Sequence, residues 1–170
     1  MKTTRTVAIT MFEALSQIAL GQMEDSVLEK TMTNFEALKR VKDDFEELKK
    51  ELFKRLYGDV EKMDEKKRKG IQEFFDALSK VKSDEDAVAV KKEYPELFET
   101  RVKEMNVIVS LLNKEVEIEI EKVDEKAFVA GVIKGNKKVS VAEAEGLFRP
   151  LFEEKEKKEA DFSELDELMK

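Results

Sequence analysis

Carboxylates are the most abundant side chains in this 170-residue chain that could do chemistry. Glu117 and Glu119 alternate with apolar residues, so both lie on one face of a predicted strand. Two carboxylates can act as general acid and base. However, any half-buried strand exposes its polar residues in this pattern, and the sequence offers no pocket, oxyanion donor or metal partner beside them. We interpret these glutamates as a solvated face and predict no catalytic residue.

A second acidic cluster, Asp84-Glu85-Asp86, follows Ser83. It lacks the glycine and the closing glutamate of a calcium loop. Acidic residues behind a serine are typical of the first turn of a helix, where they satisfy free backbone N–H groups. We therefore predict a helix start here and no metal site.

The basic run Lys66-Lys67-Arg68-Lys69 stands beside Gly70 and could contact phosphate. Acidic residues flank it on both sides, at Glu65 and Glu73. A mixed charge pattern of this kind is typical of a solvated helix, so we favour a helix start over a phosphate site.

The composition excludes several classes of site. The chain contains no His and no Cys, which removes imidazole bases, thiolate nucleophiles, disulfides and nearly all zinc or haem ligation. Its 32 basic and 39 acidic residues give a net charge of −7, which disfavours nucleic acid and anionic membranes as partners. We predict no cofactor and no small-molecule substrate.

No stretch approaches the roughly 20 apolar residues that a membrane span requires. The fairly apolar residues 7–20 are interrupted by Glu13, Ser16 and Gln17, which disfavours a signal peptide. The expectation is a soluble, cytoplasmic protein.

The predicted fold class is mainly α: an elongated antiparallel helical hairpin or bundle with a small β element near residues 115–121. Charged residues make up 42% of the chain and apolar residues 41%, including 11 Phe, so long helices with charged outer faces can still bury a core. We expect one helical domain over residues 1–152, followed by a charged linker and an amphipathic tail over 153–170.

Apolar spacing predicts the main helices. A long helix covers residues 25–57 and ends at Gly58; shorter ones cover about 10–20 and the region of 71–81. Pro95 suits the first turn of a fourth helix. This helix carries a coiled-coil seam, expected to pack antiparallel along the long helix, at Phe98, Val102, Met105, Val109 and Leu112.

The strand around Val116, Ile118 and Ile120 needs a partner for its backbone groups. Three are available: residues 2–9, residues 137–141, or the same strand of a second copy. We favour residues 2–9, whose β-branched composition suits a short strand, although they could also form the first turn of the first helix.

Residues 124–134 are predicted to form a short helix closed by Gly135-Asn136, although residues 132–141 could instead form a hairpin about that turn. Ser140 and Glu143 have the spacing of a capping box, which indicates a further helix behind them.

An apolar stripe returns after the charged linker, within the last nine residues. Such a stripe often docks on a partner, and either this domain or another chain could receive it. The candidate partner-binding residues are Phe162, Leu165, Leu168 and Met169.

Three segments carry a resemblance to a known family: ELFKRLYGDV, SLLNKEVEIEIEKV and VSVAEAEGLFRPLF. Over residues 23–152 the chain resembles small uncharacterised helical-hairpin proteins encoded in the structural-gene regions of bacteriophages and prophages. It has a longer insert between the hairpin arms and an extra tail. The resemblance implies a virion-assembly or host-interaction context and no catalytic or cofactor residues.

The functional expectation is a non-enzymatic interaction, assembly or adaptor protein that binds a protein partner or itself. The alternative is an acidic DNA mimic that occupies a DNA-binding protein, which would require rows of acidic residues with phosphate-like spacing.

Overall fold

The computed structural model describes residues 1–153, which are mostly helical with one small antiparallel sheet. The prediction of a mainly α fold with a small β element is therefore confirmed. The elements are β1 (Lys2–Thr4), α1 (Arg5–Gln17), α2 (Asp25–Tyr57), α3 (Glu65–Ser79), α4 (Asp84–Glu93), α5 (Pro95–Asn113), β2 (Glu115–Glu117), α6 (Glu125–Gly135), α7 (Val141–Phe148) and the 3₁₀ helix Arg149–Leu151.

The described chain forms two compact units. The first unit contains Met1–Ile18 and Met32–Ile120, and the second contains Ala19–Thr31 and residues 121–153. The chain passes between them three times: after Ile18, after Thr31 within α2, and after Ile120. The expected boundary between residues 152 and 153 stays a prediction. Within residues 1–153, no helix combines the length and apolar character needed to cross a bilayer.

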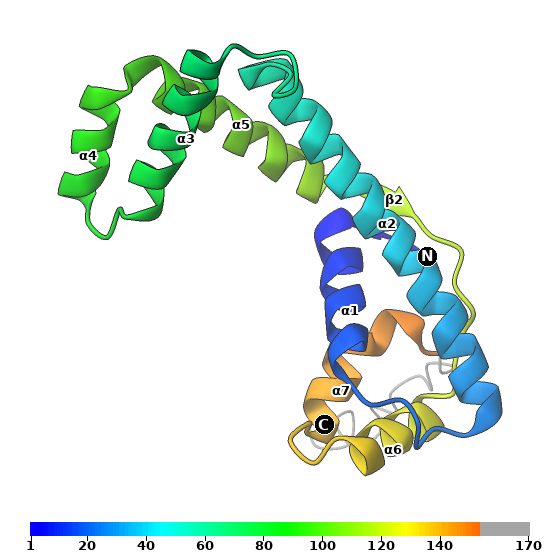
Figure 1. Ribbon diagram of the computed structural model, residues 1–170. Helices are drawn as coiled ribbons and strands as arrows, with labels where there is room; N and C mark the ends of the chain where they lie inside the picture. The colour runs from blue at the N-terminus through cyan, green and yellow to red at the C-terminus, as the bar shows by residue number, and fades with distance from the viewer. Residues whose placement is uncertain (154–170) are drawn as a thin grey trace, which may run out of the picture. The chain divides into compact units, whose positions relative to one another are not determined.

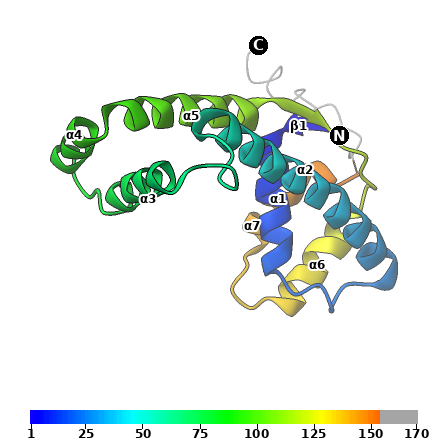
Figure 2. The ribbon, with the colours of Figure 1, turned by 45° about the horizontal axis from the view of Figure 1, so that its top comes forward.

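The predicted strand pairs with the N-terminal segment, as expected. β1 and β2 are antiparallel, with Thr3 opposite Val116. Figure 2 shows β1 beside the end of α5 and leading directly into α1. The strands span only three residues each, because Thr4 ends β1 by capping α1, its hydroxyl accepting a hydrogen bond from the Val7 N–H.

The first helix begins five residues before the predicted start at Thr10. Thr4 and Thr10 both stand where a hydroxyl could cap a helix, and the earlier one is used. The Arg5 N–H donates to the Lys114 carbonyl oxygen immediately beside the paired strands. A contact with a segment more than a hundred residues away therefore helps to set where this helix begins.

Helix α2 has the predicted bounds but a rotated inner face. Leu38 and Phe45 are buried as expected, whereas Met32 and Leu48 of the predicted stripe are exposed. The polar residue Asn34 is fully buried instead. Gly58 follows the helix with φ of 103°, a left-handed conformation in which a side chain would be strained.

An aromatic cluster forms the core at the α3 end of the first unit, where α3 and α4 lie side by side (Figure 1). The Tyr57 ring centroid lies 4.6 Å from that of Phe53 and 5.5 Å from that of Phe75. Phe74 is fully buried between Phe75 and Tyr94, at centroid distances of 5.3 and 5.7 Å. These edge-to-face and tilted contacts tie α2, α3 and the start of α5 together.

The second unit has its own core around Phe128 of α6. Its ring lies 5.2 Å from that of Phe148 and 5.5 Å from that of Phe152, and all three are buried. Val123 adds a backbone bridge to Phe152, with its N–H donating to the Leu151 carbonyl oxygen at 3.0 Å.

Residues 125–135 form the predicted helix, and the hairpin alternative is not adopted. Asn136 ends α6 as its C-cap residue, and its side-chain amide also binds both backbone groups of Ala19. The Asn136 side chain accepts from the Ala19 N–H at 2.7 Å and donates to the Ala19 carbonyl oxygen at 3.0 Å. Capping boxes also form as predicted at Ser140, which opens α7, and at Ser83, which opens α4.

Candidate functional site

Helix α5 is held at both ends within the first unit. Pro95 occupies its first turn, where the missing N–H would have had no partner. Its last turn contains no basic residue, and a cation from α1 takes that role. The Arg5 guanidinium donates to the Leu111 carbonyl oxygen at 2.6 Å, and the Thr6 hydroxyl donates to that of Leu112 at 3.0 Å. Both bonds satisfy free carbonyl groups at the negative end of the helix.

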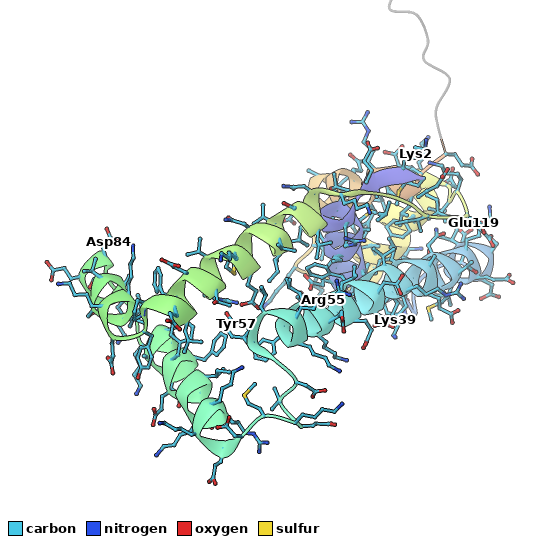
Figure 3. All side chains as sticks on the ribbon, turned by 90° about the horizontal axis from the view of Figure 1, so that it is seen from above. Lys2, Lys39, Arg55, Tyr57, Asp84 and Glu119 are labelled. Carbon is cyan, nitrogen blue, oxygen red and sulfur yellow. The ribbon has the colours of Figure 1, made fainter. Side chains whose placement is uncertain are left out.

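One side of α5, its inner face, packs on the unit. The residues that share this face are buried or half-buried: Leu97, Arg101, Glu104, Ile108 and Leu111. Glu104 is only 7% exposed, and its carboxylate accepts hydrogen bonds from the Tyr57 hydroxyl at 3.0 Å and from Arg101 at 2.7 Å. Figure 3 shows Tyr57 at the end of α2, on the side of α5.

The environment of Tyr57 changes its acidity. Burial, then the hydrogen bond to Glu104 and the negative charge of that carboxylate, raise the pKa of the Tyr57 hydroxyl far above its ordinary value. The phenol therefore stays protonated and keeps donating to Glu104 at neutral pH. This polar pair joins the end of α2 to the middle of α5.

The predicted coiled-coil seam lies on another side of α5. We call this side the outer face and define it by Phe98, Val102, Met105, Val109 and Leu112. Val102, Met105 and Val109 are 47%, 42% and 50% exposed. For these three residues the prediction of packing along the long helix is therefore wrong, whereas Phe98 and Leu112 are half-buried. The residues that α5 buries are about a quarter turn away around the helix, because 3.6 residues make one turn.

The C-terminal part of the outer face has no exposed charge beside it, whereas Glu99 and Lys103 are exposed near its N-terminal part. Among residues 104–113, Glu104 is the one charged residue, and it is buried. The next nine positions, 105–113, carry no charge, in a chain in which 42% of the residues are charged. Depletion of charge around exposed apolar residues is characteristic of the centre of protein–protein interfaces.

A shallow hollow of about 500 Å³ adjoins this face at the C-terminal end of α5. Its walls combine neutral polar and apolar groups with one cation: Asn106, Val107, Ser110, Leu111, Asn113 and Lys114. Val107 is itself 40% exposed. The hollow extends the uncharged surface toward β2.

The residues that the sequence singled out for chemistry are not brought together. The four glutamates of the predicted strand are all exposed: Glu115, Glu117, Glu119 and Glu121. Figure 3 shows that Glu119 lies far from Asp84, which marks the start of α4. No group of three or more carboxylates among residues 1–153 is arranged to hold a metal ion.

The two charged clusters are helix starts, as predicted. Asp86 completes the capping box of α4 by accepting from the Lys82 and Ser83 N–H groups at 3.0 and 3.1 Å. These hydrogen bonds lower the pKa of the Asp86 carboxyl group, and the bond from the Lys82 N–H has the largest effect. The basic run at residues 66–69 lies exposed in the first turns of α3, behind the cap at Asp64.

The predicted partner-binding residues Phe162, Leu165, Leu168 and Met169 lie outside the described residues. Comparison of the chain with protein-family models, curated proteins and solved structures found no match. The absence of charged residues over positions 105–113 can be read from the sequence and is the signal that could have marked the outer face of α5 as an interaction surface.

Proposed function

We propose that this protein is a non-enzymatic interaction protein with an assembly or adaptor role, acting in the cytoplasm through the outer face of α5. The observation that carries the proposal is the exposure of Val102, Met105 and Val109 at coiled-coil spacing on a helix that carries no charge over residues 105–113. Such a face gains from association because its apolar area leaves water when another helix covers it.

The resemblance to phage- and prophage-encoded helical-hairpin proteins supports an assembly context for this role. The apolar stripe at Phe162, Leu165, Leu168 and Met169 is proposed as a second binding element. Deletion of residues 161–170 is expected to weaken capture of the partner in a pull-down. Capture at full strength would remove that stripe from the proposal.

The exposed surface does not favour the DNA-mimic alternative. Such a mimic needs rows of uncompensated carboxylates, whereas acids along α2 form ion pairs with neighbouring basic residues. These pairs are Lys39 with Asp43, Lys49 with Glu46, Lys50 with Glu47 and Arg55 with Glu51. Exposed pairs contribute little to stability but give the helix a mixed surface potential.

Photo-crosslinking tests the proposed role of α5. A photoreactive amino acid at Val109 in the full chain should give discrete covalent protein adducts on illumination in cells. The same amino acid at Val88 of α4, an apolar position that is 51% exposed, serves as the matched control. Absence of adducts from position 109, or the same adducts from both positions, would contradict the proposal.

A further inference from the structure

The outer face of α5 has the detailed pattern of a two-stranded coiled coil. Its five residues are spaced by four, three, four and three, so Val102 and Val109 occupy a positions. Phe98, Met105 and Leu112 then occupy d positions. In parallel coiled coils, Val or Ile at a with Leu at d favours two strands, and this seam has Val at both a positions and Leu at one d position. The chemistry of the missing partner is therefore that of one further helix.

The positions that flank this seam define what kind of helix can cover it. Charges at the e and g positions usually select a complementary partner. Here two of the e positions are Asn106 and Asn113 and one g position is Ile108, while the cation at the other, Arg101, is already bound to Glu104. The remaining e position is Glu99, an exposed acid at the N-terminal end of the seam. From Met105 to Asn113 no flanking charge demands a partner of opposite sign, so two identical faces can meet there without repulsion.

The charge of the whole chain adds to this argument. With a net charge of −7, two copies repel each other over most approaches. The uncharged stretch over residues 105–113 offers an approach in which no like charges face each other at contact. The acidic C-terminal segment is a poorer occupant, since Asp161, Glu164, Asp166 and Glu167 would find no exposed cation on that stretch.

We propose that the outer face of α5 binds the same face of a second copy of this chain. This inference rests on the proposed function and names the partner. The 19 residues of α5 span about 28 Å at 1.5 Å per residue. One pair of helices of that length falls at the low end of interface sizes, below about 1,200 Å² in total, where contacts are weak and transient. The dimer is therefore in exchange with monomer at micromolar concentrations.

Sedimentation velocity of the full chain over a concentration series tests the inference. The wild type should shift toward twice the mass of the 19.7-kDa chain as concentration rises. Val102→Glu with Val109→Glu should weaken dimerisation at least tenfold, because each glutamate would be buried opposite its copy. Val88→Glu, equally exposed but on α4, should leave dimerisation unchanged, and far-ultraviolet circular dichroism checks that all variants remain helical.

A disulfide experiment supplies a second readout, since the chain has no native Cys. Met105→Cys lies at the middle of the seam and should form a disulfide-linked dimer on mild oxidation, whereas Val88→Cys should not. A wild type that stays monomeric at all concentrations overturns the inference, as does a dimer that survives both glutamates. Adducts from position 109 to a different protein would then leave the proposed function standing without the second copy.

A monomer whose position 105 becomes reactive only after removal of residues 161–170 would also overturn the inference. That result would assign the face to the chain's own C-terminal segment.

Discussion

The Tyr57 hydroxyl donates a hydrogen bond of 3.0 Å to the Glu104 carboxylate, joining the end of α2 to the middle of α5. Tyr57 is 2% exposed and Glu104 is 7% exposed, so water does not replace the bond if either group is removed. The bond turns Glu104 inward and so orients α5, which leaves Val102 and Val109 on the outside.

Replacement of Tyr57 by Phe should therefore destabilise the first unit. The buried carboxylate would keep only its bond to Arg101, so the free energy of unfolding should fall by about 1–2 kcal/mol. Chemical denaturation followed by circular dichroism measures the change. Ser79→Ala, which removes an exposed hydroxyl bonded within its own helix, should change stability by less than about 0.5 kcal/mol. Equal effects of the two substitutions would contradict the assigned role of the Tyr57 hydroxyl.

The raised pKa of Tyr57 predicts a loss of stability at alkaline pH. The unfolded chain releases the phenolic proton near pH 10, whereas the folded chain holds it to higher pH. The unfolded state therefore binds fewer protons above about pH 10, and the free energy of unfolding falls as pH rises. The fall should be less steep in Tyr57→Phe. Tyrosinate absorbance is a clean probe because the chain has two Tyr and no Trp; release of two protons near pH 10 from the folded wild type would refute this expectation.

Two glycines should respond in opposite ways to replacement by alanine. A Cβ at Gly131 in α6 would lie 2.6 Å from Met23 Cγ and 3.0 Å from Met23 Cα, so Gly131→Ala should cost about 1–3 kcal/mol. A Cβ at Gly146 in α7 meets nothing within 4 Å. Gly146→Ala should therefore stabilise the protein by about 0.5–1 kcal/mol through reduced backbone entropy of the unfolded chain. Thermal denaturation compares the two, and stabilisation by both would show that α6 does not approach Met23 so closely.

Arg5 should contribute more to stability than its neighbour Thr6. Its side chain is 9% exposed and donates to the end of α5, and its Nε atom is buried without a hydrogen bond in the described part of the chain. Arg5→Ala removes a charge-assisted bond at the negative end of the helix and should cost about 1.5–3 kcal/mol. Thr6→Val removes an exposed bond and should cost less than about 1 kcal/mol, as measured by urea denaturation. The reverse order would contradict Arg5 as the cap of α5.

Helix ends were predictable from the sequence because their signals are local. Gly58, Ser83, Pro95 and Ser140 each act on backbone groups within a few residues, and each stands at the predicted boundary. Thr4 was missed as the N-cap because the Thr10 hydroxyl could cap a helix equally well by local sequence. The pairing of β1 with β2 favours a helix start at Thr4.

Which side of a helix is buried was less predictable. The apolar spacing of α5 fits a seam at Val102, Met105 and Val109, yet the face that contains Arg101 and Glu104 is the one covered. Their polar groups satisfy each other and Tyr57, a relationship between residues 47 positions apart that no local pattern records. In α2 likewise, the polar residue Asn34 is fully buried although the apolar spacing did not place it on the inner face.

The most direct test of this account is the reactivity of single cysteines with a maleimide in the otherwise cysteine-free chain, at protein concentrations too low for self-association. We predict that Val109→Cys on the outer face of α5 reacts nearly as fast as an unfolded peptide. Val132→Cys, at a position that is 0% exposed, should react at least a hundredfold more slowly. Equally slow reaction at position 109 would show that the chain itself covers the outer face and would contradict the account.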